Sequence, residues 1–190
     1  MIISNVCNEC PSYKIIKIHT ECTYCDNAAF HPSYSTAGKS LRQQMDEGIE
    51  FHKVRYRTTE HYLAYFQAYS NTYAPLEKLK SLYEEALAHP QVVGIVIGTR
   101  PDCMPDELLS YLEELNRRTF LIVEYGVEST DNATLKRINR GHTFEAAEEA
   151  IRRTAEKGIR VGVHIILGLP GETSEQLIQQ AGVLSSLPIT

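Results

Sequence analysis

The chain has 190 residues, of which 43% are hydrophobic and 23% charged, and its formal net charge is −5 at pH 7. This length predicts one domain with a sizeable core, and the acidic balance excludes a protein that coats nucleic acid through its overall charge. No apolar run approaches membrane-spanning length, and residues 1–4 are too short for the core of a signal peptide, so we expect a cytoplasmic protein without a membrane partner.

Four of the five cysteines stand near the start of the chain, in the pattern C-x2-C-x11-C-x2-C: Cys7, Cys10, Cys22 and Cys25. Thiolates paired at this spacing are typical of metal centres, and the lack of an export signal favours reduced thiols over disulfides. Two interpretations stay open here, a structural zinc site or an iron–sulfur cluster that uses three of the four thiolates. The fifth cysteine, Cys103, is expected to be a small buried residue.

The first third of the chain contains a strand-like run, YKIIKIH, between the two cysteine pairs, and a helical pattern over residues 38–52. From residue 62 onward, short apolar runs alternate with amphipathic helices. Strands are predicted over residues 62–67, 92–97, 120–127 and 160–167. The apolar character of these runs indicates strands that are covered by helices.

Capping signals mark the helices between these strands. Pro75 and Pro105 each open a helix with leucines at helical spacing. A helix from about residue 143 to 157 is stopped by Gly158, and Thr173 with Gln176 fits a capping box for the last helix.

Strand–helix–strand repetition predicts parallel strands with right-handed crossovers. An open doubly wound sheet and a (β/α) barrel both satisfy this pattern. No G-x-G-x-x-G segment follows any strand, which weakens a dinucleotide-binding interpretation. A barrel would need more strands than are visible, so a barrel here would be partial.

Polar or glycine-rich segments follow all four predicted strands. They include Gln67, then Arg100 and Asp102, then Glu128, and finally GLPGET at residues 168–173. In a parallel sheet these segments meet at the carboxyl edge, where α/β enzymes build their sites.

Each of these residues also has a simpler interpretation. GLPGET fits a tight turn with a helix cap as well as a ligand-binding loop, and Glu128 fits a helix-capping carboxylate. Arg100 fits an ordinary salt bridge. His164, in the middle of a strand, is expected to be a hydrogen-bonded interior residue, whereas His142 in a loop is the better functional candidate.

Two basic stretches could contact phosphates: residues 52–57, and the group Arg152, Arg153 and Lys157. We favour a solvated protein face for both.

Five segments after residue 60 occur in order and at plausible spacing: YLAYFQAYSNTYAP, IGTRPDCMPDE, EYGVES, LKRINRGH and HIILGLPGET. With them the chain resembles radical SAM enzymes, in particular the bacterial proteins related to the Elongator catalytic subunit. The segment CPSYKIIKIHTECTYCDN also fits this subfamily, whose cluster cysteines are spaced C-x11-C-x2-C. The resemblance implies an α/β fold, a partial (β/α)6 TIM-like barrel. Residues 1–190 would form one core domain, with a cluster-binding region at 1–30 and repeated β/α units at 60–190.

The resemblance also implies cofactors. Cys10, Cys22 and Cys25 would hold a 4Fe-4S cluster, and the open iron would bind S-adenosylmethionine, whose reductive cleavage gives a 5′-deoxyadenosyl radical that abstracts hydrogen from a substrate. This chain has Cys7, Asn8 and Glu9 where the family has glycine and phenylalanine before the first cysteine, so Cys7 is the alternative first ligand.

Roles in binding S-adenosylmethionine carry over where motifs match. Tyr24 would pack near the adenine, Gln67 would follow the strand that meets the methionyl amino group, and Glu128 would contact the ribose or the methionine. Arg140 would pair with the methionyl carboxylate. Gly168 and Leu169 would border the adenine, and no residue is assigned a catalytic role.

The resemblance further implies an electron donor such as flavodoxin or ferredoxin, and a tRNA base as a candidate substrate, since a base in a single-stranded loop can enter a barrel mouth. The alternative is a zinc ribbon around YKIIKIH, packed on an α/β domain that binds RNA without catalysis. That alternative leaves the strand-end motifs unexplained.

Overall fold

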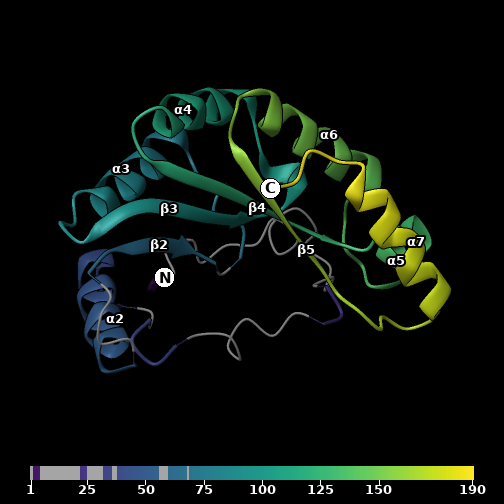
Figure 1. Ribbon diagram of the computed structural model, residues 1–190, viewed down its shortest axis with the longest axis horizontal. Helices are drawn as coiled ribbons and strands as arrows, with labels where there is room; N and C mark the ends of the chain where they lie inside the picture. The colour runs from purple at the N-terminus through teal and green to yellow at the C-terminus, as the bar shows by residue number, and fades with distance from the viewer. Residues whose placement is uncertain (1, 5–21, 25–31, 36–37, 56–59, 68) are drawn as a thin grey trace.

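The computed structural model describes residues 2–4, 22–24, 32–35, 38–55, 60–67 and 69–190. Within them, five parallel strands form one sheet, in the order in which they occur along the chain (Figure 1). These strands are β1 (Ile2–Ser4), β2 (Tyr62–Phe66), β3 (Val92–Thr99), β4 (Phe120–Glu128) and β5 (Arg160–Ile165). Unbroken sequential order is the arrangement of a (β/α) barrel, because a doubly wound sheet reverses its strand order. The sheet is therefore part of a barrel.

Helices cover the convex face of this sheet (Figure 1). They are α3 (Leu76–Leu87), α4 (Asp106–Asn116) and α6 (Phe144–Glu156), while α2 (Leu41–Arg55) and α7 (Ser174–Ser185) lie at its two ends. The turn η2 (Pro101–Cys103) and the short helix α5 (Asn132–Arg137) follow β3 and β4. Apolar side chains between the convex face and the helices form the main core, whose largest fully buried members include Phe66, Tyr83, Ile95, Ile97, Leu112, Leu121 and Tyr125.

The predicted capping signals begin and end the helices as expected. Pro75 and Pro105 are the N-cap residues of α3 and α4. The backbone N–H of Gln176 donates to Thr173 Oγ1 at 3.3 Å and the Thr173 N–H donates to Gln176 Oε1 at 2.8 Å, which completes the capping box of α7. Gly158, with φ +71°, follows α6 in the left-handed conformation that ends helices.

Among the elements of the described residues, β1 and α5 were not expected from the sequence. β1 has three residues, too few for a period of alternation to be visible, and it pairs with β2 in parallel. α5 has six residues, too few for a helical apolar stripe, and its start is marked by the cap residue Asp131. The strand-like run YKIIKIH lies outside the described residues.

The concave face of the sheet is partly polar, in contrast to the convex face. Successive strand residues point to opposite faces, so Phe66 and Val123 face the helices, whereas Tyr65 and Glu124 face the concave side. Gly162 lies on the concave face beside Glu124, where an added Cβ would come within 2.9 Å of Glu124 Cγ. Among the described residues, no helix is both long and apolar enough to cross a bilayer.

Candidate functional site

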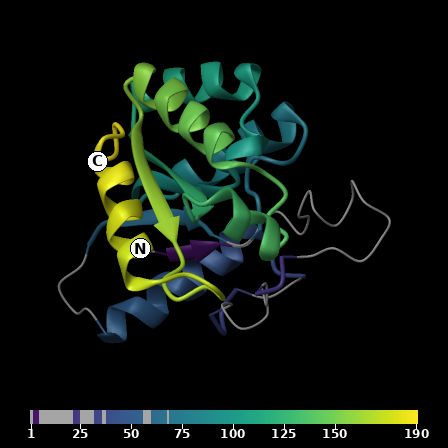
Figure 2. The same cartoon turned by 90° about the vertical axis from the view of Figure 1, so that its right-hand side faces the viewer.

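The carboxyl ends of β2 to β5 meet at one edge of the sheet, because all these strands run in the same direction. Loops that leave this edge carry the polar segments singled out in the sequence. Figure 2 shows the molecule turned so that β5 runs down the front of the view, with α7 beside it.

Arg140 is the centre of these contacts. Its side chain is only 9% exposed, and all three guanidinium nitrogens donate hydrogen bonds. Nε donates to His142 Nε2 at 3.0 Å, Nη2 donates to the Gly126 carbonyl at 2.6 Å, and Nη1 lies 3.8 Å from the Cys22 sulfur. A guanidinium that is hydrogen-bonded through every nitrogen has a fixed orientation, so the positive charge of Arg140 has a fixed position at this edge.

The end of α5 places Arg140 at this position. Asn139 adopts φ 57°, the Asn139 N–H donates to the Lys136 carbonyl at 3.1 Å, and the Arg140 N–H donates to the Leu135 carbonyl at 2.9 Å. These two bonds around a left-handed residue form a Schellman motif, in which asparagine replaces the usual glycine. The motif turns the chain sharply, and the side chain of Arg140 enters the sheet edge as a result.

Glu128 ends β4 and pairs with Arg140. Its φ of 69° is rare for a residue other than glycine, and the pairing with β5 shifts register between Gly126 and Glu128. Glu128 Oε1 lies 3.5 Å from Arg140 Nη2, and the Glu128 side chain is 13% exposed. Burial raises the pKa of Glu128 above its usual range, and the Arg140 charge opposes that effect. Glu128 is therefore an ion-pair partner within the site and does not cap a helix.

The N-terminal segment 22–24 docks on the turn after α5. The Thr23 N–H donates to the Ile138 carbonyl at 3.1 Å, and Cys22 is buried with its thiol against Arg140. The ring of Tyr24 packs against a small apolar cluster formed by Leu135, Ile138 and Leu169. Its hydroxyl oxygen is buried beside Cys22 and Glu128 without a hydrogen bond of normal geometry to a described residue, and burial raises the pKa of this tyrosine. A buried polar atom without a partner is costly unless a ligand satisfies it.

The structure brings some of the predicted site residues together and not others. Cys22, Tyr24, Glu128, Arg140 and Leu169 come together at the sheet edge.

The other predicted site residues lie beside that group or outside the described part of the chain. Gly168, with φ +82°, directly precedes Leu169. Gln67 directly follows β2, and within the described residues no hydrogen bond joins its side chain to that group. Cys10 and Cys25, like the alternative ligand Cys7, lie outside the described residues, so the choice of three thiolates stays a prediction.

His142 supports Arg140 from the loop side. Its Nε2 accepts from Arg140 Nε, so its Nδ1, which lies 3.1 Å from the Thr143 carbonyl, carries the proton in the neutral ring. Burial, and next the Arg140 charge, lower the pKa of His142 to about 4. The sequence named His142 as a functional candidate, and this residue contacts Arg140 within the candidate site.

Arg100 makes the salt bridge that the simpler interpretation predicted. Its Nε and Nη2 donate to the two carboxylate oxygens of Asp102, at 2.9 and 2.8 Å. Both residues belong to the segment that leaves β3, so this bidentate pair braces the loop at the sheet edge.

A second polar group, not identified from the sequence, lies on the concave face. Tyr65 on β2 donates its hydroxyl to Glu124 Oε2 on β4 at 2.6 Å, and His164 Nε2 on β5 lies 2.8 Å from the same oxygen. The hydrogen bond expected for His164 is present, but its side chain is 55% exposed and not interior. The bond to His164 lowers the pKa of Glu124, and the bond to Glu124 raises the pKa of His164. The alternation of side chains along the strands is the sequence signal that could have found this group, since all three residues fall on positions that face away from the helices.

Comparison with known proteins identifies the family. The family model of the Radical SAM superfamily matches residues 2–180. The chain belongs to the radical SAM superfamily. The uncharacterized protein YtqA of Bacillus subtilis is 38% identical over 187 residues, which is 95% of this chain and 56% of YtqA. The chain spans about half the length of these curated relatives, which include YhcC of Escherichia coli, of which it covers 50% at 35% identity.

Further comparisons agree with the Elongator-related resemblance of this radical SAM chain. The tRNA uridine(34) acetyltransferase of Methanocaldococcus infernus is 31% identical over 100 residues, which is 53% of this chain and 18% of that protein. The solved structure of archaeal Elp3 from the same organism matches with a TM-score of 0.60 and 21% identity, over 72% of this chain and 36% of Elp3. The structural likeness confirms the radical SAM fold predicted from the sequence.

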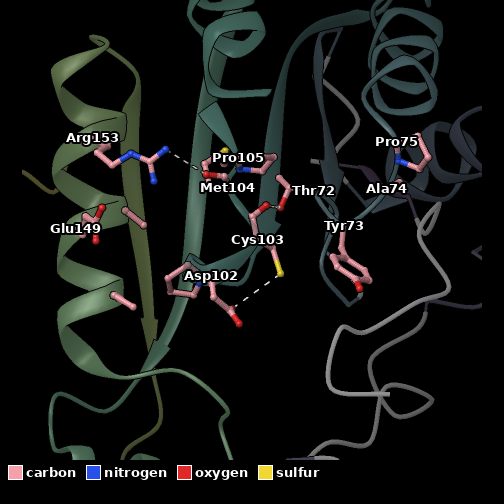
Figure 3. A pocket seen from close by; sticks show the side chains of 13 residues that line it. Thr72, Tyr73, Ala74, Pro75, Asp102, Cys103, Met104, Pro105, Glu149 and Arg153 are labelled. Carbon is pink, nitrogen blue, oxygen red and sulfur yellow. Dashed lines mark hydrogen bonds between the residues drawn. The ribbon is translucent and has the colours of Figure 1, made fainter. Parts of the chain in front are cut away.

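A cavity of about 640 Å³ opens on the helix-covered side of this radical SAM domain, between the loop before α3, η2 and α6 (Figure 3). Cys103 lines it and is buried as expected, with its sulfur 3.9 Å from Asp102 Oδ1. Arg153 lines it as well and bonds to the Met104 carbonyl and to Asp106. Cys103 and Arg153 both bond to neighbouring protein atoms here. We therefore do not assign either residue to the candidate cofactor site.

The two basic stretches fit a solvated face where the structure describes them. Among the described residues, their ion pairs are Lys53 with Glu50 at 2.6 Å, Arg152 with Glu148 at 2.8 Å, Lys157 with Glu113 at 2.9 Å, and Arg153 with Asp106. Residues 56 and 57 lie outside the described residues.

Proposed function

We propose that this chain is the core of a radical SAM enzyme that holds a 4Fe-4S cluster through Cys10, Cys22 and Cys25 and binds S-adenosylmethionine at the carboxyl edge of the sheet. The observation that carries the proposal is the burial of Cys22 against Arg140, beside Glu128, at the edge where the family's strand-end motifs gather. When bound, the two cofactors supply a 5′-deoxyadenosyl radical that abstracts hydrogen from a substrate.

The described residues fit these cofactors. The Cys22 sulfur lies 3.8 Å from Arg140 Nη1, so the guanidinium would offset the negative charge of a cluster held by thiolates at this position. The buried Tyr24 hydroxyl, which makes no hydrogen bond of normal geometry to a described residue, offers one to a ligand at the apolar cluster that includes Leu169. A nucleoside ring against that cluster and a carboxylate at Arg140 would each meet a group of matching chemistry.

The residues of the chain then have defined tasks. Arg140 orients the methionyl carboxylate, and His142, as a neutral acceptor, holds Arg140 in position. Glu128 balances the Arg140 charge and contacts the ribose or methionine. Tyr24, Gly168 and Leu169 enclose the adenine and exclude water from it, while Gln67 at the end of β2 meets the methionyl amino group.

The substrate proposed for this site is a tRNA base. The support is the 31% identity to a protein named tRNA uridine(34) acetyltransferase over 100 residues. A flavodoxin or ferredoxin is the proposed electron donor, and the cytoplasm is the proposed location because the thiolates must stay reduced.

Anaerobic reconstitution with iron and sulfide tests the cluster. The variants to compare with wild type are Cys7→Ala, Cys10→Ala and Cys22→Ala, with Cys103→Ala as the matched control of a buried cysteine outside the set. We expect about four irons per chain in wild type, Cys7→Ala and Cys103→Ala, and loss of the cluster in the other two. Reduction with dithionite and S-adenosylmethionine should then give 5′-deoxyadenosine. One zinc per chain, lost in Cys7→Ala as well as in Cys10→Ala, would instead show a structural zinc site.

A further inference from the structure

The group formed by Tyr65, Glu124 and His164 has no part in the cofactor contacts proposed above. We propose that the imidazolium of His164, held by Glu124, donates a hydrogen bond to a neutral carbonyl oxygen of the substrate on the concave face of the sheet. Glu124 and Tyr65 are positioning residues in this scheme. The inference rests on the proposed function, because it assigns the substrate side of the same site.

Only one nitrogen of the His164 ring has a hydrogen-bond partner among the described residues. Its Nε2 lies 2.8 Å from Glu124 Oε2, and no described residue bonds to its Nδ1. Since the carboxylate accepts the proton on Nε2, Nδ1 is a donor when the ring is protonated and an acceptor when it is neutral. The exposure of 55% leaves the ring open on the concave face.

The position of Glu124 is set by a hydrogen bond from Tyr65 and by the space that Gly162 leaves beside it. The Tyr65 hydroxyl donates to Glu124 Oε2 at 2.6 Å, across β3, so that one carboxylate oxygen joins three strands. Gly162 on β5 leaves room for the Glu124 side chain, because a Cβ there would lie 2.9 Å from Glu124 Cγ. Carboxylate, hydroxyl and imidazole are thus preorganised before any ligand arrives.

The group lies next to the proposed cofactor residues. In the pairing of β4 with β5, His164 is the register partner of Gly126, whose carbonyl accepts from Arg140. Among the described residues, the charged groups that act on His164 are Glu124 and Glu128, both on β4, and Tyr65 reaches it through Glu124. A substrate atom bonded to His164 would therefore lie close to the cofactor contacts.

Charge balance decides which oxygen the site favours. His164 with its proton and ionised Glu124 form a pair without net charge, and Glu128 adds a negative field. A phosphate oxygen would gain nothing from a pair without net charge and would be repelled by Glu128, whereas a neutral carbonyl accepts the Nδ1–H bond without that repulsion. Uracil-type bases carry such carbonyls, so the base of a tRNA fits this chemistry.

The test uses the reconstituted enzyme with a pool of unmodified tRNA transcripts and measures tRNA-dependent formation of 5′-deoxyadenosine across pH. His164→Ala should lower kcat/KM for tRNA at least about tenfold, the value of one hydrogen bond to a charged group, while affinity for S-adenosylmethionine changes less than about twofold. His61→Ala, an exposed histidine before β2, is the matched control and should behave as wild type. Glu124→Gln should move the alkaline limit of the rate to lower pH, since the bond to Glu124 raises the pKa of His164. A merely structural Glu124 would lower the rate without moving that limit.

Four results would overturn the inference. Unchanged kcat/KM in His164→Ala would remove the substrate contact, and a matching loss of affinity for S-adenosylmethionine would assign His164 to the cofactor instead. Formation of 5′-deoxyadenosine that tRNA does not stimulate in wild type would exclude the tRNA carbonyl as the acceptor, while the proposed radical SAM function would stand. If wild type forms no 5′-deoxyadenosine under any condition, the proposed function and this inference both fail.

Discussion

Arg140 joins parts of the chain that are far apart in the sequence, since it contacts Cys22, 118 residues before it, and the Gly126 carbonyl on β4. A buried cation is tolerated only when its donors are satisfied. Here the three nitrogens meet a thiol, an imidazole and a carbonyl, and Glu128 balances the charge. Lysine cannot copy this pattern, because its single ammonium lacks the planar fork of donors.

We therefore expect Arg140→Lys to lower the free energy of unfolding by about 1–3 kcal/mol, the cost of leaving buried partners unsatisfied. Chemical denaturation of the purified chain measures this change. Arg117→Lys is the matched control, because Arg117 is 70% exposed and pairs with Glu113 within one helix turn, and it should change stability by less than about 0.5 kcal/mol. Equal effects of the two substitutions would refute the central role of Arg140.

His142 makes stability depend on pH in a defined window. Its pKa is about 4 in the folded chain, below the ordinary value of 6.5, because burial and the Arg140 charge disfavour the imidazolium. Between these two values the unfolded chain binds more protons than the folded one, so stability falls as the pH drops from about 6.5 to about 4. The loss should not exceed about 3 kcal/mol, since one pKa unit corresponds to about 1.4 kcal/mol.

Denaturation midpoints of wild type and His142→Gln across this window isolate the contribution of His142. Glutamine can accept from Arg140 but does not titrate, so the stability difference between the two proteins should shift in favour of the variant as the pH falls. A difference that stays constant from pH 7 to pH 4 would show that His142 is protonated equally in both states.

At the scale of elements, long periodic segments were predictable and short ones were not. The apolar runs of β3 and β4 and the leucine stripe of α4 are confirmed because burial against the opposite layer imposes their periods. α5 depends on a cap and a Schellman turn, which involve few residues and leave no period. For the same reason the pairing of Glu128 with Arg140 was not visible, although both residues were singled out separately.

The cap of α5 should matter for the site. Asp131 accepts hydrogen bonds from the backbone N–H groups of Ala133 and Thr134, at 3.1 and 3.0 Å. Asp131→Ala should cost about 0.5–2 kcal/mol of stability, whereas Asp131→Asn retains a capping oxygen and should cost much less. Because α5 leads into the turn that carries Arg140, we also expect the alanine variant to weaken binding of S-adenosylmethionine, measured by titration calorimetry on the reconstituted protein. Full binding in a destabilised alanine variant would separate the helix from the site.

In the whole molecule, two segments that are far apart in the sequence meet at the carboxyl edge of the sheet. Residues 22–24 belong to the cysteine-rich segment, while residues 138–140 follow β4, and the Thr23 bond to Ile138 and the Cys22 contact with Arg140 join them. The sequence could predict which residues share the sheet edge, since parallel strands all end there. It could not predict that Tyr65, Glu124 and His164 meet on one carboxylate oxygen, because that contact depends on the curvature of the sheet and on the room left at Gly162.

This arrangement predicts that ligand binding stabilises the whole chain. A ligand that contacts both parts binds only the folded state, and at one hundred times its Kd it adds about 2.7 kcal/mol. For a chain of this length that corresponds to a rise in melting temperature of roughly 5–11 °C. We expect this shift when S-adenosylmethionine is added to the reconstituted wild type and to Cys103→Ala, followed by circular dichroism. Cys22→Ala, which loses the contact to Arg140, should show no shift, and a shift as large as that of wild type would mean that the ligand binds without Cys22.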